Sequence, residues 1–309
     1  MPNFYLPFNQ TPGITGSNST IGALSHLFIS FAHTEPHKLI EGANIAGVYG
    51  IPNSCSCWAA GRYIQAPPML GDFMLDLNLL NSYNVGFCLT FTNSLITEKE
   101  LGDVQGNMIM ELANNGMNSV IVSSPYLEEY LRNRYPNFKY ISSITKCEDS
   151  IDAINEACER YDLVVPNHFY NKNFEFLKQI KHPEKIKLLA NSFCSSYCKK
   201  SAYHYNLIER VTLLNVADNE VDPRFECTIR GKDWAEVLKF KDTISNTDVY
   251  GKYSDMGFNH FKLEGRTDSP VDIVSTFTYY MVKPQYREEM NIRLLKILRG
   301  EPVSFASDN

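Results

Sequence analysis

The feature that most constrains this chain is a repeated alternation between short β-rich runs and stretches with helical spacing. Most of the β-rich runs are apolar on both faces, which is typical of strands in a parallel sheet that helices cover. The stretches between them carry apolar residues three and four apart, as in Leu101, Val104, Met108 and Leu112, and this spacing predicts amphipathic helices. We expect strands at residues 4–8, 45–49, 85–92, 119–123, 139–144, 162–165, 187–190 and 260–263.

The number of alternations predicts an α/β fold of the (β/α)₈, TIM-barrel-like type, in which functional groups gather at the carboxyl ends of the strands. A doubly wound open sheet is the alternative. Such a sheet normally has a glycine-rich phosphate turn after an early strand, and the sequence has none. No Pro- or Gly-rich linker divides the chain, so we expect one α/β barrel domain over residues 1–309, with C-terminal helices at about 271–299.

Composition and charge exclude some classes of function. The net charge of −6 and the pI of about 5.7 give no field that attracts a polyanion, which disfavours a general nucleic-acid binder. The sequence has no membrane span, which needs roughly 20 apolar residues, and no basic-then-apolar leader. We expect a cytoplasmic protein whose eight cysteines are buried thiols, metal ligands or catalytic groups rather than disulfides.

Two cysteines lie directly after an expected strand. In KLLANSFCSSYCKK an apolar strand ends at Asn191, and Cys194 and Cys198 follow with a C-x₃-C spacing. A strand-to-helix turn lets two thiolates converge, and Cys227 follows beyond a polar loop. Soft thiolates at such loops suit an iron–sulfur cluster or zinc. The alternative is that they are buried or incidental thiols.

A fourth thiolate is expected from the loop after the strand at residues 45–49. This loop contains Cys55 and Cys57, and in a barrel it lies at the same carboxyl face. We favour Cys57, because it lies nearer to the turn at residues 61–62. The alternative is that both are ordinary loop thiols.

Polar side chains stand at or near most of the expected strand ends. Lys262, Glu264 and Arg266 are two residues apart, so in an extended strand they share one face. Their charges suit an anionic substrate, although the same residues can form a structural ion network. The substrate-binding candidates are Arg62, Asn93, Asn167, Asn191 and Arg266, and the catalytic candidates are His204, Lys262 and Glu264. Asparagine is also a common turn residue, and His204, between two tyrosines, is also a packing candidate.

These motifs give the chain a resemblance to a known family. It resembles the collagenase-like peptidases, family 32 of the peptidases of unknown catalytic type, over about residues 44–290. One segment matches the family's asparagine, paired cysteines and His-Tyr, and another matches its Gly-x-x-x-Phe-Lys-x-x-x-Arg end piece. The segments that carry the resemblance are SSPYLEEYLRNRYPNFKYISSI (123–144), NKNFEFLKQI (171–180), LLANSFCSSYCKKSAYHYN (188–206) and MGFNHFKLEGR (256–266).

The resemblance implies a cofactor. Several family members look like oxygen-independent hydroxylation proteins that act on RNA or ubiquinone precursors and carry a 4Fe–4S cluster on four cysteines. By resemblance, Cys194, Cys198 and Cys227 would bind such a cluster. The chain lacks the cysteine pair that some members place before the C-x₃-C region, and it has Lys199 where many have proline. The fourth ligand is therefore open between Cys57, its neighbour at position 55 and a group other than cysteine.

We therefore expect an iron–sulfur-dependent redox enzyme that performs oxygen-independent hydroxylation, or a related modification, of an anionic small molecule or an RNA-borne base. Zinc is the alternative metal. One alternative function is a collagenase-like peptidase, although the sequence has neither an H-E-x-x-H zinc helix nor a G-x-S-x-G elbow. A second alternative is a non-catalytic iron–sulfur subunit that assembles with a partner subunit of the same family.

Overall fold

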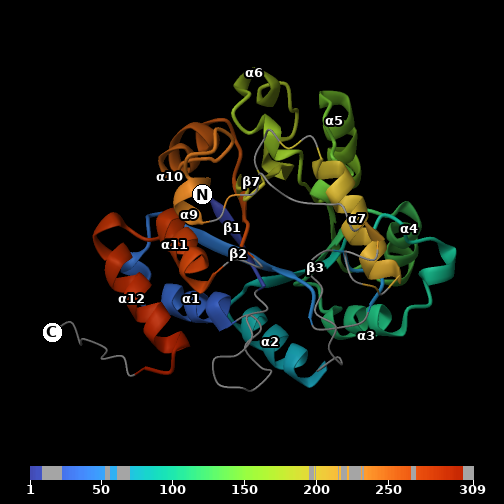
Figure 1. Ribbon diagram of the computed structural model, residues 1–309, viewed down its shortest axis with the longest axis horizontal. Helices are drawn as coiled ribbons and strands as arrows, with labels where there is room; N and C mark the ends of the chain where they lie inside the picture. The colour runs from blue at the N-terminus through green and yellow to red at the C-terminus, as the bar shows by residue number, and fades with distance from the viewer. Residues whose placement is uncertain are drawn as a thin grey trace.

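The computed structural model describes residues 1–8, 23–52, 56–60, 70–194, 198, 200–214, 216, 221–222, 231, 233–265 and 269–301. In this part of the chain, eight strands form one parallel sheet in the order β6-β5-β4-β3-β2-β1-β8-β7. A parallel bridge between Val164 and Ile186 joins the two edges, so the sheet nearly closes into a barrel. Helices surround the strands (Figure 1). The predicted (β/α)₈ fold is confirmed.

All eight expected strands are present, and their ends lie close to the predicted positions. The strand predicted at 260–263 is matched at both ends. The strands are β1 Asn3–Pro7, β2 Asn44–Gly50, β3 Gly86–Phe91, β4 Ser119–Val122, β5 Lys139–Ser142, β6 Leu163–Val164, β7 Lys187–Asn191 and β8 His260–Leu263.

The helices that connect the strands are partly those expected from the sequence. Two were not expected, α1 Ala23–Thr34 and α2 Leu70–Ser82. In α2 the apolar residues do not follow one clear stripe. The longer ones that follow are α3 Val104–Ala113, α4 Pro125–Arg134, α5 Ile151–Arg160, α7 Ser201–Leu214, α11 Pro270–Met281 and α12 Arg287–Leu298. The short ones are α6 Phe174–Leu177, α9 Trp234–Val237, α10 Asn246–Asp248, the 3₁₀ turns η1 Pro36–Lys38, η2 Glu98–Glu100, η3 Ile144–Lys146, η4 His168–Tyr170, η5 Pro183–Lys185 and η7 Pro284–Tyr286, and the π-helix η6 Val249–Tyr253.

Side-chain caps fix where several helices begin. Ser150 Oγ accepts the N–H of Ala153 at the start of α5. Ser269 caps α11 in the same way, and Pro270 occupies the first helical position, where a missing N–H costs nothing. The two C-terminal helices, α11 and α12, pack on each other and on α1 (Figure 1), in agreement with the helices predicted at about 271–299.

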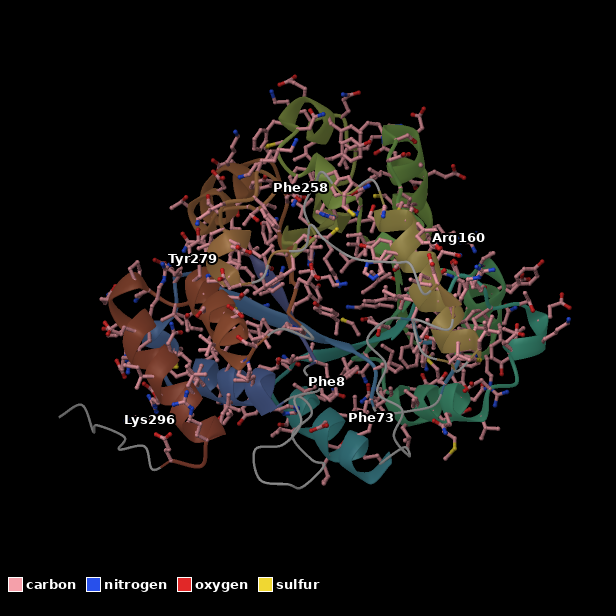
Figure 2. All side chains as sticks on the ribbon, in the orientation of Figure 1. Phe8, Phe73, Arg160, Phe258, Tyr279 and Lys296 are labelled. Carbon is pink, nitrogen blue, oxygen red and sulfur yellow. The ribbon has the colours of Figure 1, made fainter. Side chains whose placement is uncertain are left out.

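The core has two parts, one inside the barrel and one between the strands and the helices. The inner part contains Tyr5, Tyr49, Cys88, Ile121, Ile141 and Val165. In the outer part the ring centroids of Phe8 and Phe73 lie 5.0 and 5.5 Å from that of Phe87, between the sheet and α2 (Figure 2). Cys158 is also fully buried there, as expected for a thiol that packs as a small hydrophobe. Across the described ranges, no helix is long and apolar enough to cross a bilayer.

Candidate active site

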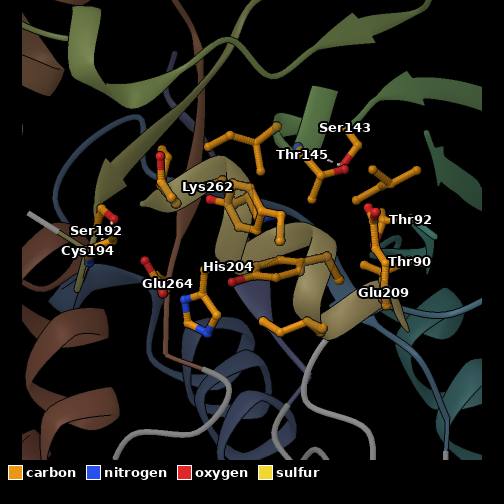
Figure 3. Close-up of a pocket in the computed structure, with 18 residues that line it drawn as sticks. Thr90, Thr92, Ser143, Thr145, Ser192, Cys194, His204, Glu209, Lys262 and Glu264 are labelled. Atoms are coloured by element: carbon orange, nitrogen blue, oxygen red, sulfur yellow. Dashed lines mark hydrogen bonds between the residues drawn. The ribbon is translucent and has the colours of Figure 1, made fainter. Parts of the chain in front are cut away.

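A cavity of about 150 Å³ opens at the carboxyl ends of the strands (Figure 3). The strands contribute inward-facing side chains to it, and one face of α7 forms the opposite wall. The strand side includes Tyr49, Thr90, Ile121, Leu189 and Lys262. The helix side includes Ser201, His204, Tyr205, Ile208 and Glu209. The cavity therefore lies where a barrel fold places its chemistry.

Lys262 enters the cavity because of the alternation along β8. Its neighbours Phe261 and Leu263 are fully buried in the outer core, so Lys262 and Glu264 point inward together, as the two-residue spacing predicted. The Lys262 Nζ lies 4.2 Å from the centroid of the Tyr49 ring. Among the described lining residues, Lys262 is the only lysine or arginine.

Glu264 is held at the end of β8 by main-chain hydrogen bonds. Its Oε2 accepts the N–H of Phe193 at 3.0 Å. The side chain of Asn191 braces the same residue, because its Oδ1 accepts the Glu264 N–H at 3.0 Å and its Nδ2 donates to the Glu264 carbonyl at 3.2 Å. These bonds cross from β7 to β8 and fix the direction of the Glu264 carboxylate.

The three asparagines predicted to bind substrate all form hydrogen bonds with the protein main chain. Asn191 makes the brace just described. Asn93 donates to the carbonyls of Cys57 and Glu209, at 2.9 and 3.2 Å. Asn167 Oδ1 accepts the N–H of Phe169 at 3.1 Å and caps η4. None of the three lines the cavity in the described part of the chain, so their contacts support the turn and bracing interpretation.

His204 lies near the start of α7 and lines the cavity beside Glu264 (Figure 3). Its main-chain N–H donates to the Lys200 carbonyl at 2.9 Å, so the helix fixes its direction. All three catalytic candidates from the sequence, His204, Lys262 and Glu264, therefore come together. Arg62 and Arg266 lie outside the described residues, and so does Cys227.

Cys194 stands at the end of β7 and lines the same cavity, half-buried. Its main-chain N–H donates to Ser192 Oγ at 3.1 Å, and its carbonyl lies 3.2 Å from His168 Nε2. Burial lowers the pKa of His168, and the carboxylate of Asp242, 3.4 Å away, acts in the opposite direction. Cys198 is buried in the segment that leads to α7.

The surroundings of Cys57 favour the neutral thiol. Its main-chain N–H donates to Asp103 Oδ2 at 3.0 Å. Burial, followed by the charge of Asp103, raises the pKa of Cys57 to about 12. A metal ligand must be a thiolate, so binding by Cys57 would have to overcome this cost. Within the described ranges, no group of three or more His, Cys, Asp or Glu side chains is arranged to hold a metal ion.

The sequence reasoning missed two features of the site. Glu209 is a buried carboxyl group that lines the cavity from α7. Its signal was its helical spacing, because Ser201, Tyr205, Ile208 and Glu209 follow one face of a helix. The second feature is the pair of His168 and Asp242. These two residues are far apart in the sequence and come together only in the folded chain, so no short motif could predict the pair.

Comparisons with known proteins show that this chain is similar to a protease and to a peptidase. No family model matches the chain. An uncharacterized protease of Methanocaldococcus jannaschii is 23% identical over 168 residues, which is 50% of this chain and 48% of the relative. The match thus spans about half the length of each protein. A solved structure, that of the U32 peptidase Mk0906, has a TM-score of 0.53 at 12% identity and covers 87% of this chain and 95% of its own.

The fold and the cavity define an α/β barrel with a cavity at the carboxyl ends of its strands. The structural likeness shows the same fold, and the two comparisons together support the resemblance to the collagenase-like U32 peptidases. The iron–sulfur, hydroxylase-like branch of that family is not shown by either comparison.

Proposed function

We propose that the chain is a peptidase-like barrel hydrolase that cleaves an amide bond in the cavity at the carboxyl ends of the strands. The observation that carries the proposal is the convergence of Lys262, Glu264 and His204 on one cavity. The names of the two similar proteins, a protease and a U32 peptidase, favour hydrolysis over the redox reaction that the sequence first suggested.

The side chains in the cavity supply the groups that amide hydrolysis needs. The reaction requires a group that takes a proton from water and a group that stabilises negative charge on the carbonyl oxygen. Glu264, oriented by the Phe193 N–H, is suited to the first role. Lys262 is suited to the second, because its cation reaches the same space from β8. His204, beside Glu264, is suited to orient the attacking water.

The size of the cavity bears on the substrate. At about 150 Å³ it is smaller than the roughly 300–1,000 Å³ typical of sites for drug-sized ligands. The apolar side chains Ile121, Leu189 and Ile208 line it together with the charged groups. We propose that it holds one small side chain or acyl group of a peptide, with a negative group of the substrate near Lys262.

The test is hydrolysis of an internally quenched peptide library by the purified protein. Glu264→Gln should lower kcat/KM by about 10²–10⁴-fold, the usual contribution of a general base. Glu111→Gln is the matched control, because that carboxylate lies on the surface of α3 with 57% of its side chain exposed. Equal rates for wild type and Glu264→Gln, with equal melting temperatures, would contradict the proposed role of the cavity.

A cluster-dependent redox enzyme is the second candidate, and Cys194 and Cys198 favour it. The two thiols lie four residues apart in the segment after β7, and one of them lines the cavity. Thiolates of this kind suit an iron–sulfur cluster, with zinc as the alternative. Cys194 is the only cysteine among the described lining residues, so the donor set would need Cys198, Cys227 and a further group. When bound, such a cluster would supply electron transfer.

Metal analysis after anaerobic purification tests the second candidate. Wild type should contain iron and sulfide, and Cys194→Ala, Cys198→Ala and Cys227→Ala should each lose them. Cys158→Ala is the control, because that thiol is buried on α5 in the outer core. Zinc in place of iron would keep the ligands and remove the redox function. Protein without metal that still hydrolyses peptides would exclude the cluster from the reaction.

A further inference from the structure

Glu209 is a buried carboxyl group that has no role in the hydrolysis proposed above for Glu264, Lys262 and His204. It is 3% exposed and lines the cavity near Thr90 and Thr92 (Figure 3). Ser94 Oγ donates to its Oε2 at 2.6 Å, and Asn93 Nδ2 donates to its main-chain carbonyl at 3.2 Å. The segment after β3 therefore holds both the side chain and the main chain of Glu209.

The surroundings of this carboxyl group favour its neutral form. Burial raises the pKa of Glu209, while the donors of Ser94 act in the opposite direction. No lysine or arginine in the described ranges pairs with it. The titratable groups around it are Cys147 at the end of η3 and His204 and Tyr205 on the same helix. Tyr49, Lys262 and Glu264 line the cavity from the strand side.

The cavity thus holds two carboxyl groups in different surroundings. Glu264 accepts a main-chain N–H at the end of a strand. Glu209 lies on a helix whose inner face also presents Ile208, and its carboxyl group accepts the hydroxyl of Ser94. Two carboxyl groups in unlike environments commonly divide the roles of acid and base.

We propose that Glu209 donates the proton to the leaving nitrogen, an inference that rests on the proposed hydrolase function. Water adds to the amide carbon while Glu264 takes one of its protons. As the C–N bond breaks, the electron pair stays on nitrogen, and Glu209 gives its proton to that nitrogen. The products are a carboxylic acid and an amine. The proton on Glu264 returns through solvent to Glu209, so the reaction consumes one water and no other reactant.

The test compares two substrates with the same acyl group: the peptide amide selected by the library assay and its 4-nitrophenyl ester. The 4-nitrophenolate leaves as an anion and needs no proton, whereas the nitrogen of an amide must be protonated before it leaves as an amine. Glu209→Gln should therefore lower kcat/KM for the amide by about 10²–10⁴-fold and for the ester by less than about 10-fold. Glu264→Gln should lower both, because both need activated water.

Each outcome decides the inference. Equal losses for amide and ester in Glu209→Gln would overturn the donor role and leave the hydrolase function standing. If wild type hydrolyses neither substrate, the hydrolase function fails and the donor role falls with it. If Glu209→Gln does not fold, the pH profile of wild type decides: amide hydrolysis should fall as pH rises and Glu209 loses its proton, and ester hydrolysis should not. Parallel profiles for the two substrates would overturn the inference.

Discussion

Lys187 is the most unusual buried charge in the part of the chain that the structure describes. It begins β7, points into the barrel and is fully buried. Its Nζ lies 3.5 Å from the centroid of the Tyr5 ring and has no hydrogen-bond partner among the described residues. Substitution by methionine keeps a similar shape and removes the charge, so Lys187→Met measures what this cation costs.

The cost follows from the change in pKa. Burial lowers the pKa of Lys187 from 10.5 to about 8, and the nearby Cys88 opposes the change only in part. Each pKa unit is worth about 1.4 kcal/mol, so the charged form costs about 3 kcal/mol in the folded state. The cation–π interaction with the Tyr5 ring offsets about 2 kcal/mol of this cost at most. Lys187→Met should therefore raise the free energy of unfolding at pH 7 by about 1–3 kcal/mol.

The sign of the pH dependence is the sharper test. Between pH 8 and 10.5 the unfolded chain binds more protons at this residue than the folded chain, so wild-type stability should rise with pH across this window. The advantage of Lys187→Met should shrink by about 3 kcal/mol over the same range. Urea unfolding at a series of pH values measures both, and the exposed Lys181→Met is the control. An advantage that does not change with pH would refute the reasoning.

Three further predictions concern packing, charge and catalysis. Gly106→Ala on α3 should destabilise the protein by about 1–3 kcal/mol in urea unfolding, because the new Cβ would lie 2.3 Å from the Trp58 ring; unchanged stability would refute this packing. Glu128→Gln should cost about 3 kcal/mol at pH 7. Burial raises the pKa of Glu128, but hydrogen bonds from Tyr161 and two arginines lower it below its usual value, so this cost should shrink as acid protonates the carboxylate in wild type. A cost that persists in acid would argue against the ion pairs. Lys262→Met should lower kcat for amide cleavage by about 10²-fold, and an unchanged kcat would remove Lys262 from catalysis.

The strands and the barrel could be predicted because the pattern that encodes them is local. Strands that are covered on both faces appear in the sequence as short apolar runs. The number of these runs and the distance between them are compatible with few topologies. The α2 helix could not be predicted, because its apolar residues are spread around the helix. The α1 helix was missed although Leu24, Leu27, Phe28 and Phe31 follow the helical spacing. Short-range hydrogen bonds decide at which residue a helix begins or ends. The sequence predicted that α3 begins at about Leu101, but Asp103 caps the helix two residues later.

The strand side of the site could be predicted, whereas on α7 His204 was predicted and Glu209 was not. Strand alternation fixes the direction of Lys262 and Glu264 once β8 is known. The direction of Glu209 depends on where α7 begins and on how that helix rotates over the cavity, which packing decides. The sequence could not decide the role of the asparagines, because an amide at a strand end can bond a neighbouring main chain as well as a ligand. Asn191 bonds the main chain of Glu264.

Hydrolysis in water enriched in ¹⁸O tests the central claim most directly. The account predicts that the new carboxylic acid carries one oxygen from water, seen by mass spectrometry, and that this product disappears in Glu264→Gln and persists in Glu111→Gln. A substrate that gains an oxygen atom with its amide bond intact, only in protein that contains iron, would contradict the account and assign the cavity to redox chemistry.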